Sequence, residues 1–212
     1  MNPDIDDPHA GQPVLSSGPR PADARLTMIL LHGRGASADD ILSLAHELEP
    51  TDIAYLAPQA RGRTWYPYSF LTSMEQNEPG LGSALGVLSR LVEALKTDGV
   101  ESNRLGFLGF SQGACLALEY AARHATQYAA VCGLSGGLIG PPGTRREYSG
   151  SFAGTPVFLG CSDIDPHIPL DRVRESADVF RRMHANVDER IYPHMGHTVS
   201  RDEIDAVNAI LR

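Results

Sequence analysis

The feature that most constrains the fold is an alternation of short apolar runs with longer stretches of helical periodicity. The first run, Leu26–Leu31, is apolar almost throughout, as expected of a strand covered on both faces. Similar runs recur at 53–57, 105–110, 129–134 and 157–160, and a weaker one at 189–192. Strands that alternate with helices are joined by right-handed crossovers and form a mainly parallel sheet. The chain is therefore predicted to be α/β, with helices on both faces of one sheet.

The stretches between these runs predict the helices. One helical stripe contains Leu81, Leu85, Leu88, Val92 and Leu95, a second contains Leu170, Val173, Ala177, Phe180 and His184, and a closing one contains Ile204, Val207 and Leu211. No internal repeat or linker is found, so residues 25–212 are predicted to form a single domain. Residues 1–24 are acidic and interrupted by Pro and Gly, and they are predicted to be a flexible tail.

Composition and charge exclude several classes of protein. The formal net charge is -8, and the only adjacent arginines, Arg145–Arg146 and Arg181–Arg182, are interpreted as solvated. Nucleic-acid binding needs clustered Lys and Arg, so no such partner is expected. The three cysteines show neither metal-ligand spacing nor a disulfide framework, so we expect no metal, no cofactor and a reducing, cytoplasmic location. No apolar run has the length of a membrane span, and no secretory signal is recognised at the N-terminus.

Two segments match the Gly-x-Ser-x-Gly pattern of a nucleophile elbow, in which a strand, a tight turn and a helix follow one another directly. Gly109–Gly113 follows an apolar run and precedes "QGACLALEYAARH", which has the composition of a buried helix. Gly133–Gly137 also follows a run, but its continuation "GLIGPPG" cannot support a helix. Ser111 is therefore the predicted nucleophile, and Ser135 is predicted to be an ordinary loop serine.

A serine hydroxyl needs a base to accept its proton, and the base needs an acid to orient it. Downstream of Ser111, one loop after a strand holds Asp163 and Asp165, and a later loop holds His194 and His197. This is the chain order of serine, acid and histidine in α/β-hydrolases. The residue types alone leave both members of each pair open.

Four segments, "LHGRGAS", "GFSQGA", "DPHIP" and "YPHMGHT", resemble in order and spacing the phospholipase/carboxylesterase family of small α/β-hydrolases, which includes the acyl-protein thioesterases. The resemblance implies an α/β-hydrolase fold with Asp165 as the acid and His197 as the base. Asp163 is then expected to cap a loop and His194 to be a surface ring. His167 is a weaker rival for the base and is expected at the pocket rim or surface.

The resemblance also implies an oxyanion hole made of the backbone N–H groups of Arg34 and Gln112. Family members often carry Leu where Arg34 stands, but a main-chain donor tolerates this change, which brings a charge near the mouth of the site. The segment "RTWYPYSF" is the densest aromatic cluster of the chain. Trp65, Tyr66 and Phe70 are predicted to line an acyl pocket, and the alternative is a hydrophobic plug that holds this loop down.

Together these features predict a serine hydrolase that cleaves small to medium acyl esters through an acyl-enzyme, with thioesters as a second class. Two alternatives stay open: a non-catalytic binding module on the same fold, and a dienelactone-type hydrolase. The complete set of site residues argues against the first. Serine at position 111 argues against the second, which normally uses cysteine. Homodimers are common among relatives, although no exposed apolar stripe in this sequence requires one.

Overall fold

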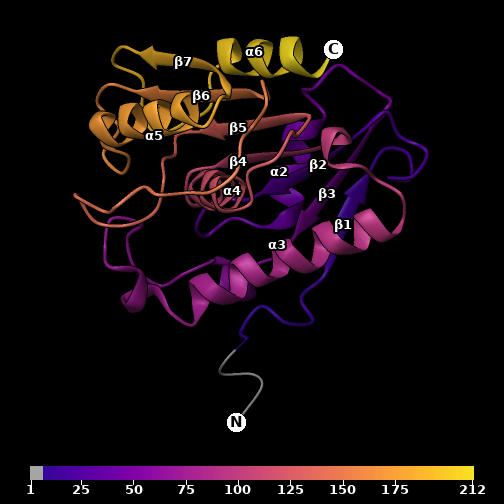
Figure 1. Ribbon diagram of the computed structural model, residues 1–212, viewed down its shortest axis with the longest axis horizontal. Helices are drawn as coiled ribbons and strands as arrows, with labels where there is room; N and C mark the ends of the chain where they lie inside the picture. The colour runs from indigo at the N-terminus through magenta and orange to yellow at the C-terminus, as the bar shows by residue number, and fades with distance from the viewer. Residues whose placement is uncertain (1–6) are drawn as a thin grey trace.

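The computed structural model describes residues 7–212, which form a seven-stranded sheet in the order β1-β3-β2-β4-β5-β6-β7 (Figure 1). Strand β1 is antiparallel to β3, and all other neighbours are parallel. The strands are β1 (Val14–Ser17), β2 (Leu26–Leu31), β3 (Ile53–Pro58), β4 (Leu105–Phe110), β5 (Ala130–Leu134), β6 (Pro156–Ser162) and β7 (Asn186–Tyr192). The prediction of an α/β fold with a mainly parallel sheet is confirmed.

Helices cover both faces of this sheet. One layer contains α3 (Gly80–Thr97), α4 (Gln112–Arg123) and α5 (Leu170–Arg182), and the other contains α2 (Ala38–Ala45) and α6 (Arg201–Leu211). Alternate side chains of β2 serve the two layers, since successive residues of a strand point to opposite faces. Ile29 and Leu31 join the cluster beneath α3, α4 and α5, whereas Met28 and Leu30 join the cluster beneath α2 and α6.

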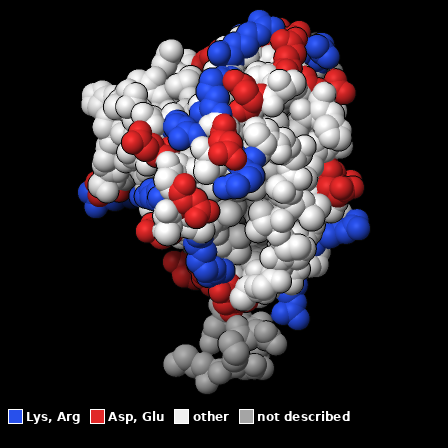
Figure 2. Space-filling view, turned by 90° about the vertical axis from the view of Figure 1, so that its right-hand side faces the viewer, with Lys and Arg blue, Asp and Glu red and all other residues white. Residues whose placement is uncertain are grey.

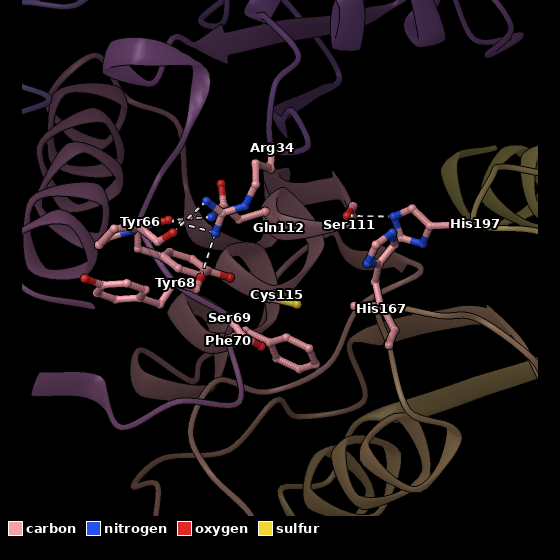
Figure 3. A pocket seen from close by; sticks show the side chains of 12 residues that line it. Arg34, Tyr66, Tyr68, Ser69, Phe70, Ser111, Gln112, Cys115, His167 and His197 are labelled. Carbon is pink, nitrogen blue, oxygen red and sulfur yellow. Dashed lines mark hydrogen bonds between the residues drawn. The ribbon is translucent and has the colours of Figure 1, made fainter. Parts of the chain in front are cut away.

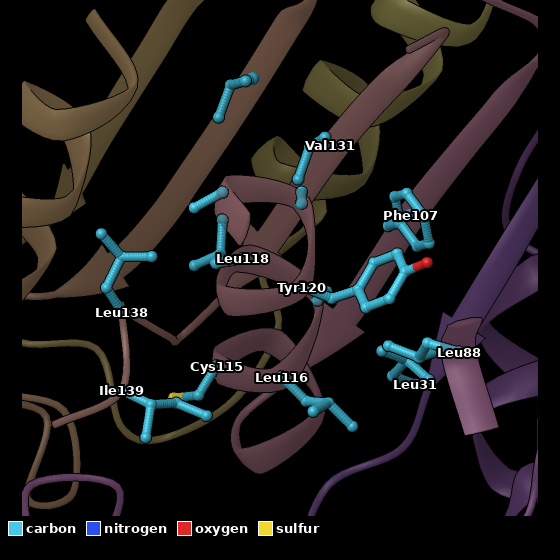
Figure 4. Packing of buried hydrophobic residues seen from close by; sticks show 14 of the residues in the cluster. Leu31, Leu88, Phe107, Cys115, Leu116, Leu118, Tyr120, Val131, Leu138 and Ile139 are labelled. Atoms are coloured by element: carbon cyan, nitrogen blue, oxygen red, sulfur yellow. The ribbon is translucent and has the colours of Figure 1, made fainter. Parts of the chain in front are cut away.

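Helix α4 lies at the centre of the larger cluster. Every residue from Gln112 to Ala122 is buried, as predicted from a stretch that is apolar nearly all round. Leu116 and Tyr120 of this helix share the cluster with Phe107 of β4 and Leu88 of α3 (Figure 4). The first turn of α4 is therefore held firmly against the sheet.

The predicted strands match best where the sheet is covered on both faces. The runs at 26–31 and 105–110 coincide with β2 and β4. The weakest run, 189–192, is the end of β7, which begins at Asn186 and has no fully buried residue. Because β7 is an edge strand, its side chains are half-buried and several are charged, which weakens the apolar signal.

The prediction of a flexible tail over residues 1–24 is wrong for the part that the structure describes, from residue 7 onward. Val14–Ser17 form β1, which pairs with Tyr55–Pro58 of β3. Residues 1–6 lie outside the described chain. The composition misled because β1 is stabilised by pairing with a strand that comes much later in the sequence.

His9 fastens this N-terminal segment to the domain. Its side chain is buried, with Nε2 2.9 Å from the Trp65 carbonyl oxygen and Nδ1 accepting the Arg61 N–H at 3.1 Å. Its own N–H donates to the Ser83 hydroxyl at 2.9 Å. Both ring nitrogens are therefore satisfied by a neutral imidazole protonated at Nε2, while a proton on Nδ1 would face a donor.

One predicted solvated arginine is buried, whereas the Lys and Arg side chains seen in Figure 2 lie at the surface among Asp and Glu side chains. The Arg146 side chain is 4% exposed, whereas that of Arg145 is 85% exposed. Arg146 Nε lies 3.1 Å from the Glu175 carboxylate, and the buried Glu119 carboxylate accepts the Ile139 N–H at 3.0 Å. These contacts hold the loop after β5. The prediction was wrong because the acidic partners lie on α4 and α5, far from residue 146 in the sequence.

The burial of His9 and His32 predicts that the folded state becomes less stable as the pH falls. Burial lowers the pKa of His9 and of His32 below the ordinary value of 6.5. The unfolded chain then takes up protons at pH values where the folded chain does not, so the stabilising contribution is complete above about pH 6.5 and is lost as the pH falls towards the folded-state pKa. We expect the free energy of unfolding, measured by urea denaturation, to decrease between about pH 7.5 and about pH 5.5.

The substitution His9→Gln isolates one of these contributions. It should cost about 1–3 kcal/mol at neutral pH, because at least one buried hydrogen-bond partner is left unsatisfied. The difference in free energy of unfolding between wild type and variant should shrink at the lower pH. There the wild type has lost the stability that depends on a neutral His9, whereas the variant has no titrating group at this position. An equal difference at both pH values would contradict the prediction.

Candidate active site

Ser111 sits on the sharp turn between β4 and α4. Its backbone has φ 56° and ψ -120°, a conformation that costs a non-glycine residue about 1–3 kcal/mol. The Ser111 N–H donates to the Leu134 carbonyl of β5 at 2.9 Å, and its carbonyl accepts from Cys115 at 3.0 Å. The turn is thus fixed on both sides, and it presents the hydroxyl at the carboxyl edge of the sheet, where ligands bind in open α/β sheets.

The glycines that flank Ser111 are required by backbone crowding. A Cβ at Gly109 would lie 2.3 Å from the Gly113 carbonyl oxygen, and a Cβ at Gly113 would lie 2.0 Å from the Leu31 carbonyl oxygen. Neither obstacle is a side chain that could move aside. The second match to the pattern is different: although Ser135 also has a positive φ of 52°, no helix follows it before α5 in the described chain. Only Ser111 therefore has the strand–turn–helix context of an elbow.

Three of the predicted residues meet at this edge. His197 Nε2 lies 2.8 Å from Ser111 Oγ, and His197 Nδ1 lies 2.7 Å from Asp165 Oδ2 (Figure 3 shows the first contact). Asp165 comes from the loop after β6, and His197 from the loop after β7. The Asp165 side chain is fully buried and that of His197 is 18% exposed, so the imidazole alone connects the carboxylate to the hydroxyl.

Asp165 is held by four donors. Oδ1 accepts the N–H groups of His167 and Ile168 at 2.8 and 3.0 Å, and Oδ2 accepts from His197 and from the Cys161 thiol at 3.8 Å. Burial raises the pKa of this carboxyl, but the hydrogen bond from His197 and the two amides outweigh burial and leave the pKa below 3.8. Asp165 is thus a fixed carboxylate at neutral pH. The two amide donors were not predicted.

The competing candidates lie elsewhere. Asp163 accepts the backbone N–H of His194 at 2.8 Å, and both residues are exposed. His167 lines the cavity beside His197, with the two ring centroids 4.9 Å apart, whereas the ring hydrogen-bonded to the serine hydroxyl is that of His197. The expected loop-capping role of Asp163, the exposed ring of His194 and the rim position of His167 therefore agree with the geometry.

The two residues predicted to supply the oxyanion donors, Arg34 and Gln112, both line the cavity that Ser111 lines. Gln112 is the first residue of α4, and Arg34 lies between Gly33 and Gly35 after β2. Within the described residues, neither backbone N–H donates to another backbone carbonyl. The N-terminus of α4 also favours negative charge here, because its free N–H groups and dipole point towards the turn.

A cavity of about 410 Å³ opens beside Ser111. Figure 3 shows Tyr66, Tyr68, Phe70 and Cys115 on one side and His167 and His197 on the other. Tyr66 and Phe70 are among the residues that line this cavity.

Trp65 does not line this cavity, which corrects the prediction for that residue. It is fully buried behind the wall, and its Nε1 donates to the His32 carbonyl at 2.9 Å. The alternative of a plug that holds the loop down fits Trp65.

Two further properties concern residues 7–212 only. No group of three or more His, Cys, Asp or Glu side chains there is arranged to hold a metal ion. No helix in that part of the chain is both long and apolar enough to cross a bilayer.

The sheet, its connections and the serine turn define the α/β-hydrolase fold. The model of the family described as Phospholipase/Carboxylesterase matches residues 12–212, so the chain belongs to that family and is an ester hydrolase.

Known proteins similar to this chain support the assignment. Acyl-protein thioesterase 1 of Yarrowia lipolytica is 26% identical over 208 residues, which cover 89% of this chain and 92% of the relative. The crystal structure of a phospholipase/carboxylesterase from Dyadobacter fermentans is 41% identical, covers 95% of this chain and 97% of its own, and superposes with a TM-score of 0.92. Acyl-protein thioesterase 2 of Zea mays, at 22% identity and a TM-score of 0.70, shares the fold; the match covers 95% of this chain and 100% of that one.

The crowding at the turn predicts the effect of adding one methyl group. Gly113→Ala should lower the free energy of unfolding by about 1–3 kcal/mol or more, because the new Cβ meets the backbone of β2 and neither segment can move without disturbing the sheet. Gly196→Ala is the matched control, since a Cβ there meets no atom within 4 Å. It should change stability by no more than about 0.5 kcal/mol. Urea denaturation of both variants tests the prediction, and equal losses would refute it.

Proposed function

We propose that this ester hydrolase is a serine carboxylesterase that acts through a Ser111–His197–Asp165 triad on esters of small to medium acyl chains, with thioesters as a second class. The observation that carries the proposal is the unbroken line of contacts from the buried Asp165 carboxylate through His197 to the Ser111 hydroxyl. A serine is a weak nucleophile on its own, and such a line supplies the base that it needs.

In the first half-reaction, Ser111 Oγ attacks the ester carbonyl carbon while His197 Nε2 takes its proton. Negative charge then develops on the carbonyl oxygen, where the N–H groups of Arg34 and Gln112 stabilise it. Each donor of this kind is worth about 3 kcal/mol of transition-state stabilisation. His197 next protonates the leaving alcohol or thiol as the carbon–oxygen or carbon–sulfur bond breaks.

In the second half-reaction, water attacks the acyl-enzyme and His197 accepts its proton. The imidazole then returns that proton to Ser111 as the carboxylic acid leaves. Throughout, Asp165 holds Nδ1–H towards itself and stabilises the imidazolium. The N–H groups of His167 and Ile168 bind Asp165 Oδ1 and leave Oδ2 directed at His197. The carboxylate therefore orients the imidazole without taking its proton.

The cavity supports the proposed substrate class. Its volume of about 410 Å³ is near the lower end for ligand sites, and its wall combines the aromatic rings of Tyr66 and Phe70 with polar groups. A short or medium acyl chain can fill such a space. The names of the thioesterase relatives support thioesters as the second class.

The two alternative functions make different predictions. A binding module would bind esters without turnover, and no step would depend on His197. A dienelactone-type hydrolase would be expected to carry a cysteine at the elbow, whereas this chain has Ser111 there. Turnover of simple esters that depends on the serine separates the proposed function from the first alternative.

The serine variants give the direct test. Ser111→Ala should lose nearly all turnover of p-nitrophenyl butyrate and all labelling by a fluorophosphonate, because the nucleophilic oxygen is gone. Ser135→Ala is the matched control from the second Gly-x-Ser-x-Gly segment, and it should keep both. Its Oγ is buried without a hydrogen-bond partner among the described residues. Equal turnover by Ser111→Ala and the wild type would end the proposal.

A pair of aspartate variants tests the choice of acid. Asp165→Asn should lower kcat on the order of 10³–10⁴-fold, because an amide no longer holds the required imidazole tautomer. Asp163→Asn should stay near the wild-type value, because a side-chain amide oxygen can still accept the His194 N–H. Steady-state kinetics on one ester compares the two. A larger loss in Asp163→Asn than in Asp165→Asn would reverse the assignment.

A further inference from the structure

We infer that the side chains of Arg34 and Gln112 are positioning residues for the oxyanion hole, and that both act by binding one loop. This inference rests on the proposed function, in which the backbone N–H groups of these two residues receive the oxyanion. The loop comprises residues 64–68, between β3 and α3, and is called the clamp loop below. It also forms part of the cavity wall.

The Arg34 guanidinium binds three consecutive carbonyl groups of the clamp loop. Nη1 donates to the Pro67 oxygen at 2.8 Å, and Nη2 donates to the oxygens of Tyr66 and Tyr68 at 2.9 and 2.6 Å (Figure 3). The planar fork of a guanidinium suits such a set of acceptors, and a lysine ammonium on a single stem does not match it. No acidic side chain in the described part of the chain forms an ion pair with Arg34, so these carbonyls are its hydrogen-bonded anchors.

Gln112, the second residue proposed to donate its backbone N–H to the oxyanion, binds the same loop through its side chain. Its Nε2 donates to the Tyr66 oxygen at 2.8 Å, and its Oε1 accepts the Trp65 N–H at 2.9 Å and the Thr64 hydroxyl at 3.2 Å. Gln112 is 6% exposed, so these bonds are shielded from water. The Tyr66 carbonyl thus receives a donor from both oxyanion residues.

The turn that contains Arg34 depends on the neighbouring residues 63–68 for its position. Gly33 and Gly35 flank the residue, Gly35 has φ 80°, and a Cβ at Gly35 would meet no atom within 4 Å. Two further bonds reach the turn from the same neighbourhood: Trp65 Nε1 to the His32 oxygen at 2.9 Å and Gly35 N–H to the Arg63 oxygen at 2.7 Å. Within the turn, the Gly33 carbonyl accepts the Ala36 N–H at 3.2 Å and lies 2.8 Å from His32 Nδ1. These local bonds shape the turn, and the guanidinium clamp ties the turn, with its Arg34 N–H, to the clamp loop.

This arrangement explains why a charged side chain stands beside a site that needs only a main-chain donor. Loss of the Arg34 side chain would leave its N–H in place but remove the three bonds that tie this turn to the clamp loop, and the oxyanion would lose part of one donor. Gln112 would still bind the Tyr66 carbonyl and the Trp65 N–H, so the cavity wall should be largely kept and the loss should appear mainly in kcat, with a smaller change in KM.

The test uses Arg34→Met, which keeps an unbranched stem without the donors, and Arg34→Lys as the conservative variant. With p-nitrophenyl butyrate, Arg34→Met should lower kcat about 10- to 100-fold with KM changed less than about threefold, since losing a whole donor costs about 10²–10³-fold. Its affinity for a trifluoromethyl ketone, which forms a tetrahedral oxyanion with Ser111, should fall by the same factor. Arg34→Lys should fall between Arg34→Met and the wild type on both measures.

Arg61→Met is the matched control, because Arg61 is an exposed arginine just before the clamp loop and its side chain makes no hydrogen bond among the described residues. It should retain wild-type kcat. Thermal unfolding midpoints of all variants check the fold, and if Arg34→Met does not fold, the intermediate loss in Arg34→Lys carries the test. In Arg34→Met/Gln112→Met, the combined loss should be smaller than the product of the single losses, because both side chains act on one loop.

Three results would overturn the inference. A folded Arg34→Met with wild-type kcat and ketone affinity, alongside an inactive Ser111→Ala, would refute the clamp and leave the proposed function intact. A rise in KM confined to an anionic ester such as mono-p-nitrophenyl glutarate would make Arg34 a substrate-binding residue instead. Losses that multiply in the double variant would show independent roles. Inactivity of the wild type on every ester would instead refute the proposed function.

Discussion

The whole site depends on how closely α4 approaches the sheet at Ser111. The backbones of β2, β4 and α4 come so near one another that positions 109 and 113 have no room for a side chain. That contact forces Ser111 into a positive φ, and the buried first turn of α4 prevents the strained residue from relaxing. The other site residues are then delivered to this fixed point by loops that follow β2, β6 and β7.

Sequence reasoning succeeds where the determinants are local. The apolar runs of the central strands and the helix that follows Ser111 are visible within a few residues, so β2, β4 and α4 could be predicted, and with them the turn that carries Ser111. It fails where the partner is distant. No residue near Val14–Ser17 indicates that this segment pairs with β3. Likewise, no neighbour of Arg146 in the sequence indicates that Glu119 and Glu175 lie beside its buried guanidinium. Propensity and composition carry no information about such long-range contacts.

The ambiguity between the two aspartates and the two histidines has a physical origin. One contact between Asp163 and His194 and another between Asp165 and His197 join the same two loops, the first at the surface and the second in the interior. Asp163 binds the backbone N–H of His194 at the exposed surface, whereas Asp165 binds the side chain of His197 in the interior. One pair thus aligns the two loops and the other forms the Asp165–His197 contact beside Ser111, and residue types alone cannot tell these duties apart.

The aromatic segment at 63–70 shows how one loop serves two purposes. Its front face, with Tyr66 and Phe70, lines the cavity, while Trp65 packs behind it against the turn that carries Arg34. On the proposed clamp, the carbonyl oxygens of this loop orient the oxyanion donors at the same time as its rings contact the acyl chain. A change of cavity shape made through this loop would then alter transition-state stabilisation as well, so acyl preference and rate cannot be tuned independently here.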